Sequence, residues 1–292
     1  MTVIFNGKAL AARKTAALKT ELEHFVGKIK IVTLSVITDE MSEFYSQKKK
    51  ALAAELGIDY QIEHIHFDDN VQILRRRIQE LNADETVTGI MLQKPHRRNY
   101  GDFFVQAKKS PTQTYDVWWH SLTEVLPLAK DVDGLSVTAA ARLAAGESVS
   151  VLPATVRAIL ASVENFDLTD KNILVLGRSD LAGLPLTNYW RHLGYQVTNW
   201  GKKELQMQLT KSEKLKNFQV IVSATGAASL ITGDMLAKEM ILLDVGEPRG
   251  DFEFSSCSPQ AAFITPVPGG IGPLTVISLL ENAFTLAQLA LV

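Results

Sequence analysis

The sequence predicts an α/β fold with two lobes, an N-terminal α/β lobe and a second, Rossmann-like lobe, with a cleft between them. Two observations support this prediction. Strand-like and helix-like segments alternate along the chain, which is typical of parallel sheets covered by helices. The chain also has 292 residues, which is long for a single hydrophobic core, and 46% of them are hydrophobic.

The first lobe is expected to contain three strands and two helices, followed by a less regular segment. The strands are the segments rich in β-branched or apolar residues, Ile29–Thr38, Tyr60–Phe67 and Val87–Leu92. One helix covers Glu40–Leu56 and ends at Gly57. The other has apolar residues three and four positions apart, at Val71, Leu74, Ile78 and Leu81. Residues 101–127 show no clear period, which predicts a helix and a long irregular loop, and Ser136–Ala145 is expected to be helical.

The second lobe repeats the alternation. Its expected strands are Asn172–Leu176, Tyr195–Trp200, Gln219–Ala224 and Met240–Val245, with a helix over Leu184–Leu193. Prolines and glycines predict a loop over Pro266–Pro273. A terminal helix is expected over Leu274–Val292. We therefore expect one lobe over residues 1–146, on which the C-terminal helix 274–292 packs back, and the other over residues 147–273.

Composition excludes several classes of function. Lys and Arg total 30 against 32 Asp and Glu, so the net charge of -2 does not favour a nucleic-acid partner. The single cysteine excludes an intrachain disulfide and a cysteine-rich zinc site, and no other pattern predicts a metal. Glu281 and Asn282 interrupt the most apolar segment, which predicts a docked helix rather than a membrane span. A cytoplasmic protein is expected.

A glycine-containing turn between a strand and a helix is the candidate nucleotide site. Gly177-Arg178-Ser179 follows a predicted strand, and Gly183 opens the next helix. Glycines let the backbone approach a pyrophosphate, and the helix N-terminus offers free N–H donors. The match to G-x-G-x-x-G is imperfect, so the turn alone is equally compatible with a purely structural role.

Three further groups of residues are candidates, each with a structural alternative. Tyr45 and Lys49 lie four positions apart on one helix face, although Lys49 belongs to a run of three lysines that could be a solvated surface. Gln93 follows a strand, where α/β folds place ligands. Asp131 and Asp133 lie in a tight segment that could equally be a simple turn.

Together these segments resemble the bifunctional methylenetetrahydrofolate dehydrogenase/methenyltetrahydrofolate cyclohydrolase family. The resemblance spans nearly the whole chain. The family's helix motif S-x-x-Y-x-x-x-K corresponds to Ser42–Lys49, and its strand-end motif to Gly89–Gln93 with Pro95. K-D-V-D-G is found at Lys130–Gly134, G-R-S-x-x-x-G-x-P at Gly177–Pro185, and a close copy of T-P-V-P-G-G-V-G-P at Thr265–Pro273.

The resemblance implies a homodimer that acts on folate substrates with NADP. Lys49 would be the central catalytic residue, Gln93 would hydrogen-bond and tune it, and Tyr45 would stack on the folate. The folate would also be bound by residues in two other motifs, Asp131, Asp133, Pro268 and Gly269. The coenzyme would be held by Gly177, Arg178, Ser179, Gly201, Lys202 and Glu247. The positive charge of the methenyl product would favour a neutral lysine that can activate water.

The chain departs from the family pattern at several positions. Ala154 replaces a usual cysteine, Gly201 a usual serine and Glu247 a common isoleucine, and the stretch from Gln93 to Asp133 is longer than usual. These changes leave open a diverged member with a single activity, or one that binds folate or nucleotide without turnover. A short-chain dehydrogenase also uses Y-x-x-x-K, but its glycine-rich turn precedes the tyrosine, whereas here it follows.

Coenzyme selectivity can also be predicted. An NAD site usually has Asp or Glu at the end of its second strand, where the carboxylate binds the ribose 2′-hydroxyl. The strand Tyr195–Trp200 is followed by Gly201 and Lys202, with no acid before Glu204. Arg178 can offer a planar guanidinium to a 2′-phosphate. The sequence therefore predicts NADP rather than NAD.

Overall fold

The computed structural model describes residues 1–37, 40–209 and 215–291. The chain forms two compact units. Unit 1 comprises residues 1–14, 143–148 and 153–278, and unit 2 comprises residues 15–142, 149–152 and 279 to the C-terminus. Helices α1 (Gly7–Glu23) and α11 (Ile271–Leu289) each contribute residues to both units.

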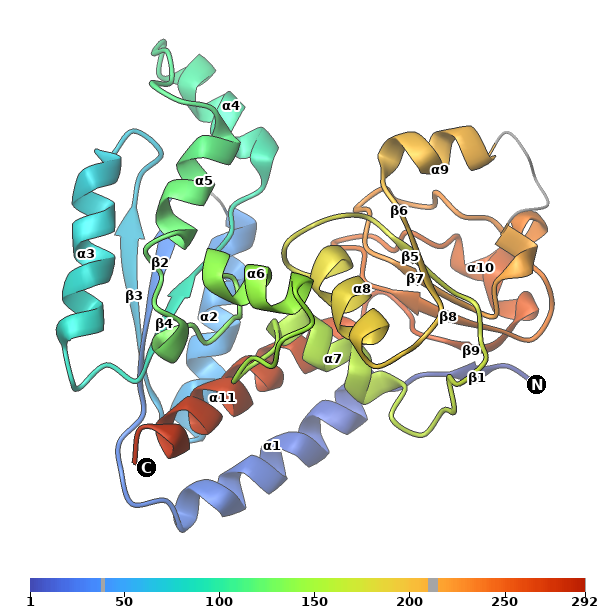
Figure 1. Cartoon of the computed structure of the whole chain (residues 1–292), viewed down its shortest axis with the longest axis horizontal. Coiled ribbons are helices and arrows are strands. Elements are labelled where there is room, and N and C mark those ends of the chain that lie inside the picture. Colours follow the sequence, from blue (N-terminus) through green and yellow to red (C-terminus); the bar gives the residue numbers. More distant parts are fainter. Residues whose placement is uncertain (38–39, 210–214, 292) are drawn as a thin grey trace. The chain divides into compact units, whose positions relative to one another are not determined.

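Unit 2 is built on a parallel sheet of three strands in the order β3-β2-β4. The strands are β2 (Lys30–Val36), β3 (Asp59–Ile65) and β4 (Gly89–Leu92). Helices α2 (Glu40–Glu55) and α3 (Val71–Ala83) lie on opposite sides of this sheet (Figure 1). These elements match the predicted strands and helices, except that Thr38 lies outside the described residues. The buried face of α3 carries Leu74, Ile78 and Leu81, as its apolar spacing predicts.

The middle of unit 2 is more helical than predicted. It contains α4 (Arg97–Gln106), α5 (Tyr115–Thr123), a 3-10 turn at Leu128–Lys130 and the start of α6 (Val137–Ala144). The expected irregular loop is therefore wrong over α5. This helix begins where the Thr114 hydroxyl accepts a hydrogen bond from Val117 N, and it is stabilised by burial of aromatic side chains. The rings packed around it include Phe67, Tyr100, Tyr115, Trp118 and Trp119.

Unit 1 contains a parallel sheet of six strands in the order β1-β9-β8-β7-β5-β6. These strands are β1 (Val3–Ile4), β5 (Ile173–Leu176), β6 (Val197–Trp200), β7 (Val220–Ser223), β8 (Met240–Asp244) and β9 (Ala261–Ile264). Its helices include α7 (Ala154–Ser162), α8 (Gly183–His192), α9 (Lys202–Leu209) and α10 (Phe254–Cys257), with 3-10 turns at Leu215–Asn217, Gly233–Met235 and Ser258–Gln260. Strands β5, β7 and β8 are buried along their whole length, which explains their continuous apolar sequences.

The two ends of the chain differ from the expected lobe boundaries. Strand β1 pairs with β9, so the first 14 residues belong to unit 1 rather than to a lobe over residues 1–146. Helix α11 begins at Ile271, so the predicted loop is too long at its end. Pro273 fits in the first helical turn because no intrahelical N–H bond is required there.

The second half of α11 packs within unit 2. The Asn282 side chain donates hydrogen bonds to Val132 O (2.9 Å) and Leu152 O (2.8 Å), and the Phe284 ring contacts Phe25 edge-on. Its predicted end at Val292 lies outside the described residues. Within the described part of the chain, no helix has both the length and the apolar character needed to cross a bilayer.

Candidate active site

A lysine–glutamine pair connects α2 to the end of β4. Lys49 Nζ donates a hydrogen bond to Gln93 Oε1 over 2.8 Å and lies 3.7 Å from Met91 Sδ. The backbone N–H of Gln93 donates to Leu34 O, which extends the pairing of β4 with β2 by one residue. Because β4 is buried along its length, this extension fixes the glutamine, and the glutamine in turn fixes the half-buried lysine.

Tyr60 and Thr33, which the sequence analysis missed, lie in the same network. The Thr33 hydroxyl donates to Tyr60 OH over 2.7 Å, and Tyr60 OH lies 3.5 Å from the sulfur of Met91. Burial raises the pKa of the Tyr60 hydroxyl, and the negative charge of Asp133 adds to the increase. The available signal was a hydroxyl-bearing side chain in each of two neighbouring strands, Thr33 in β2 and Tyr60 in β3.

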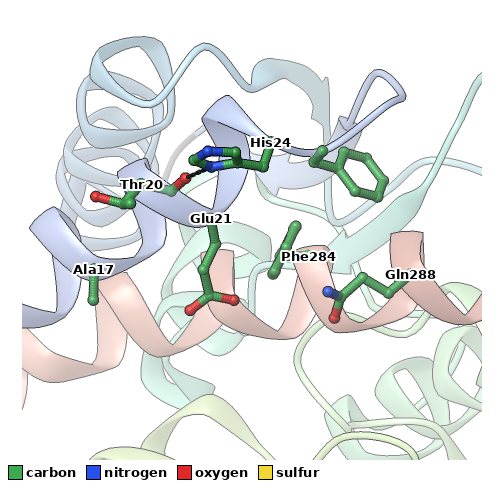
Figure 2. A pocket seen from close by; sticks show the side chains of 7 residues that line it. Ala17, Thr20, Glu21, His24, Phe284 and Gln288 are labelled. Atoms are coloured by element: carbon green, nitrogen blue, oxygen red, sulfur yellow. Dashed lines mark hydrogen bonds between the residues drawn. The ribbon is translucent and has the colours of Figure 1, made fainter.

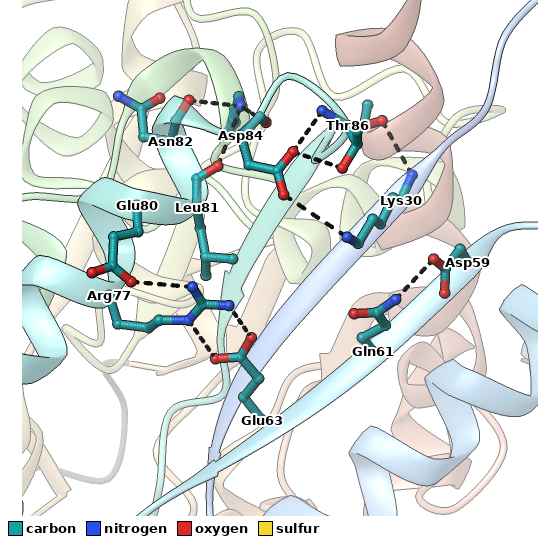
Figure 3. Close-up of polar contacts among 12 residues, drawn as sticks. Lys30, Asp59, Gln61, Glu63, Arg77, Glu80, Leu81, Asn82, Asp84 and Thr86 are labelled. Atoms are coloured by element: carbon teal, nitrogen blue, oxygen red, sulfur yellow. Dashed lines mark hydrogen bonds and ion pairs between the residues drawn. The ribbon is translucent and has the colours of Figure 1, made fainter.

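Asp133 is carried by a loop that Lys130 holds against the C-terminal end of α3. The Lys130 ammonium donates to three backbone carbonyl oxygens, those of Leu81 (3.3 Å), Asn82 (2.8 Å) and Asp84 (2.8 Å). Figure 3 shows these three acceptors together at the helix end. A cation at this position satisfies carbonyl groups that have no partner within the helix.

The same loop is fixed internally by Asp131. Its carboxylate is fully buried and accepts hydrogen bonds from the backbone N–H groups of Leu135 (3.1 Å) and Ser136 (2.7 Å). Burial raises the pKa of Asp131, although these bonds oppose the increase. The loop turns at Gly134, whose φ of 63° suits glycine. These contacts fix the backbone of the loop on both sides of Asp133. Asp133 itself is only 8% exposed.

Tyr45 lies one helical turn before Lys49 and is half-buried. Its ring packs edge-on against Phe44 at 5.6 Å, and the Lys48 ammonium lies 5.9 Å from its centre. Lys49, Gln93, Tyr45, Asp131 and Asp133 all belong to unit 2. The structure brings Lys49 and Gln93 into direct contact, and Tyr60 OH lies beside Met91, which also borders Lys49 Nζ.

The candidate nucleotide turn follows β5 in unit 1. Gly177 has a φ of 103°, and a Cβ atom there would lie 2.4 Å from Ala224 O. A Cβ atom on Gly183 would lie 2.2 Å from Gly177 O. Both positions therefore require glycine for close backbone packing, which brings Arg178 and Ser179 to the carboxyl edge of the sheet beside the N-terminus of α8. This geometry fits a dinucleotide phosphate site.

Arg178 is held by two neighbours at the edge of the sheet. Its Nε donates to Asn199 Oδ1 over 2.9 Å, and its guanidinium forms an ion pair with Glu204, also at 2.9 Å. Gly201 is buried beneath this pair, and Lys202 is exposed at the start of α9. Glu204 was noted in the sequence only as a nearby acid, because its contact with Arg178 depends on how β6 leads into α9.

Two aspartates, Asp244 and Asp251, lie at the ends of β8 and β7: Asp244 is the last residue of β8, and Asp251 accepts a hydrogen bond from Ser223 at the end of β7. Asp244 accepts hydrogen bonds from the backbone N–H groups of Gly246 (2.9 Å), Asp251 (3.0 Å) and Phe252 (3.0 Å). Burial raises the pKa of Asp244 to about 6, opposed by these bonds and reinforced by the nearby Asp251 carboxylate. The bonds shape the turn that carries Glu247, an exposed residue whose carboxylate lies against Gly272 at the start of α11.

Pro268 and Gly269 also belong to unit 1. Pro268 follows a cis peptide bond, and Gly269 has a φ of 103°. The carbonyl oxygen of Gly269 accepts a hydrogen bond from Gly7 N over 3.0 Å, so the loop is fixed against the start of α1. Their expected contact with folate stays a prediction.

A groove in unit 2 lies apart from the predicted site residues. This groove, drawn in Figure 2, lies between α1 and α11 and is lined by Ala17, Thr20, Glu21, His24, Phe25, Phe284 and Gln288. None of these is a predicted site residue. Over the described residues, no group of three or more His, Cys, Asp or Glu side chains is arranged to hold a metal ion.

Two domain models of one protein family match this chain. The tetrahydrofolate dehydrogenase/cyclohydrolase catalytic domain matches residues 5–113, and the NAD(P)-binding domain of the same family matches residues 150–291. Lys49 and Gln93 lie in the first range and Arg178 in the second. Asp133 lies between the matched ranges, so its assignment depends on the Lys130–Gly134 motif and its geometry.

Whole-chain relatives give the same result. The bifunctional protein FolD of Lactobacillus gasseri is 33% identical over 99% of this chain and 98% of its own, and that of Leuconostoc mesenteroides is 34% identical over 99% of both. The crystal structure of FolD from Campylobacter jejuni, a methylenetetrahydrofolate dehydrogenase/cyclohydrolase, superimposes with a TM-score of 0.84 at 26% identity, covering 99% of this chain and 100% of that one. The chain therefore belongs to the tetrahydrofolate dehydrogenase/cyclohydrolase family of enzymes, with a catalytic domain and an NAD(P)-binding domain.

Proposed function

We propose that the protein oxidises 5,10-methylenetetrahydrofolate to 5,10-methenyltetrahydrofolate with NADP and then hydrolyses the methenyl form to 10-formyltetrahydrofolate. In the first step a hydride leaves the one-carbon bridge, and NADP is the hydride acceptor when bound. In the second step water adds to the cationic bridge carbon, one C–N bond opens and a proton is released. The observation that carries this proposal is the 2.8 Å contact between Lys49 Nζ and Gln93 Oε1.

Lys49 is proposed as the residue that positions and activates the water. A cationic substrate nearby favours the neutral amine, which can take a proton from water. Gln93 accepts a hydrogen bond from Nζ and so directs the nitrogen, and Met91 Sδ lies 3.7 Å from the same atom. Tyr45, one turn away, is proposed to stack on the folate ring system.

Asp133 is proposed to bind the pterin through two N–H donors of its edge, a charge-assisted arrangement. Its burial and the fixed loop support this role, because a preorganised carboxylate loses little entropy on binding. The Asp131 carboxylate accepts hydrogen bonds from Leu135 N and Ser136 N. We therefore expect Asp131 to shape the loop rather than to contact folate. Pro268 and Gly269 are proposed as further folate contacts.

In the NAD(P)-binding domain, Gly177 and Ser179 are proposed to hold the coenzyme phosphates. Arg178 is proposed to bind the 2′-phosphate of NADP, with Gly201 leaving room and Lys202 adding charge. Glu247, at the carboxyl edge of the sheet, is proposed to border the nicotinamide. We also propose that the protein is a cytoplasmic homodimer. Light scattering would then give a molar mass twice that of one chain, which is 32.2 kDa.

A single assay tests the function. The purified protein is mixed with methylenetetrahydrofolate and either NADP or NAD, and formation of reduced coenzyme and hydrolysis of methenyltetrahydrofolate are followed separately. We expect both reactions. Turnover in only one of them would identify the protein as a diverged member with one activity. Coenzyme or folate binding without turnover in either would refute the proposed function.

A further inference from the structure

Glu204 occupies the place at which an NAD-binding protein would present its strand-end acid. Such an acid follows the second strand of the nucleotide fold and binds the ribose 2′-hydroxyl, whereas an arginine nearby accommodates a 2′-phosphate. Here β6 ends at Trp200, and Gly201 has no side chain. A Cβ atom on Gly201 would lie 3.0 Å from Glu204 Oε2. The carboxylate from the first turn of α9 thus fills the space above the strand end.

The same carboxylate is bound to the arginine. Glu204 Oε1 lies 2.9 Å from a terminal nitrogen of Arg178, while Asn199 Oδ1 accepts a hydrogen bond from Arg178 Nε. Asn199 is itself fixed, because its amide donates to Val175 O (3.1 Å) and Gly177 O (2.8 Å). The backbone N–H of Glu204 and the Arg178 guanidinium lower the pKa of Glu204, so the carboxylate is ionised at neutral pH. The site holds an acid suited to NAD and an arginine suited to NADP, paired with each other.

We infer that Glu204 sets coenzyme selectivity by competing with the 2′-phosphate of NADP for Arg178. This inference rests on the proposed coenzyme site. A 2′-phosphate has to displace the carboxylate from the arginine and then lie close to its negative charge, whereas a ribose 2′-hydroxyl can donate to it. The pair can open, since the side chains of Arg178 and Glu204 are 47% and 36% exposed. The protein therefore binds both coenzymes and prefers NADP less strongly than Arg178 alone would make it.

The test uses fragments that report only the adenosine end of the coenzyme. Dissociation constants of adenosine 2′,5′-bisphosphate and adenosine 5′-monophosphate are measured by calorimetry, together with those of NADP and NAD. In Glu204→Gln we expect the preference for the 2′-phosphorylated ligand to rise about tenfold, the scale on which one adjacent charge alters phosphate binding. The matched control is Glu164→Gln, which removes the same charge from an exposed position elsewhere in unit 1.

The possible outcomes separate this inference from the function on which it depends. An unchanged preference in Glu204→Gln, or an equal rise in Glu164→Gln, would overturn the inference while leaving the coenzyme site in place. Glu204→Asp keeps the charge, so a rise as large as that of the glutamine variant would also overturn it. If the wild-type protein bound neither NADP nor NAD, the proposed function would fail, and the inference with it. Thermal unfolding of each variant confirms that the compared proteins are folded.

Discussion

The charged side chains proposed to bind the folate and the coenzyme are held differently in the two units. In unit 2, Lys49 is half-buried and bound to Gln93. Asp133 is buried, and Lys130 holds its loop against the end of α3. In unit 1, Arg178 and Glu204 form an ion pair that is more than one-third exposed on both sides. Removing a buried charge leaves its partners without compensation, whereas an exposed pair contributes little to stability and is readily rearranged. Unit 2 is therefore suited to a fixed reaction geometry, and unit 1 to adjustable ligand selectivity.

The largest effect is expected at Lys49. Lys49→Ala should reduce cyclohydrolase activity by about 100- to 10,000-fold, the range for loss of a general acid or base. The fold and coenzyme binding should be preserved, because unit 1 holds the coenzyme residues. The measurement is the rate of hydrolysis of methenyltetrahydrofolate. Lys50→Ala changes an exposed lysine next to it and serves as control. Activity close to wild type in Lys49→Ala would contradict the catalytic assignment.

At Asp133 the expected effect is on binding. Asp133→Ala should weaken folate binding by about 2–4 kcal/mol, the scale for loss of a buried charged hydrogen-bond partner. Asp133→Asn keeps the shape and one acceptor, so its loss should be smaller. Titration of each variant with the folate substrate measures the dissociation constants. If both variants bound folate as tightly as the wild type, Asp133 would not contact the pterin.

For Asp244, a buried acid in unit 1, the expected effect is on the free energy of unfolding rather than on coenzyme selectivity. Its pKa is about 6 in the folded protein, against about 4 for an unfolded aspartate. The folded state thus holds a proton more tightly, so stability falls as pH rises through this window. Relative to Asp244→Asn, the wild-type free energy of unfolding should decrease by about 2–3 kcal/mol between pH 4 and pH 7. Urea unfolding at several pH values measures the difference, and a constant difference would contradict the prediction.

The smallest effect is expected at Arg178. The wild-type ratio of kcat/KM for NADP over NAD should exceed one, and Arg178→Ala should lower it by about tenfold, since one exposed charge–phosphate contact is lost. Arg191→Ala removes a charge from the end of α8 and should leave the ratio unchanged. A wild-type ratio below one would refute the NADP preference. An unaffected ratio in Arg178→Ala would remove this arginine from the phosphate site.

Most of the fold could be predicted because local patterns determine it. The apolar spacing in α3 and the β-branched segments of β2 and β3 identify those elements without tertiary information. Helix α5 does have a helical period, since its buried residues include Tyr115, Trp118, Trp119 and Leu122. It was missed because the helix has only nine residues and its period is lost when residues 101–127 are treated as one segment. Strand β1 has only two residues, and its pairing with β9 joins positions about as far apart as the chain allows.

The candidate site could be predicted only in part. Lys49 and Gln93 were identified by their motifs, and their contact is in the structure. The carboxylate of Asp131 is instead bound to backbone N–H groups, and Lys130 acts on the end of α3. These roles depend on which carbonyl and N–H groups the folded chain leaves unpaired, which no motif records. For the same reason Tyr60 was not identified as a neighbour of Met91, nor Glu204 as the partner of Arg178.

The segment between β4 and Asp133 leaves a strand and returns to the same strand. The chain departs after Leu92, and Val132 N then donates to Ile90 O over 3.4 Å, while Lys130 fixes the returning chain to α3. Both ends of this excursion thus have backbone or side-chain contacts with the scaffold. Residues added or removed near 107–113 need not shift Gln93 or Asp133, because closing a longer loop costs only about 0.6 kcal/mol for each doubling of its length. The loop between α4 and α5 is therefore a suitable place to insert a peptide tag or a reporter domain.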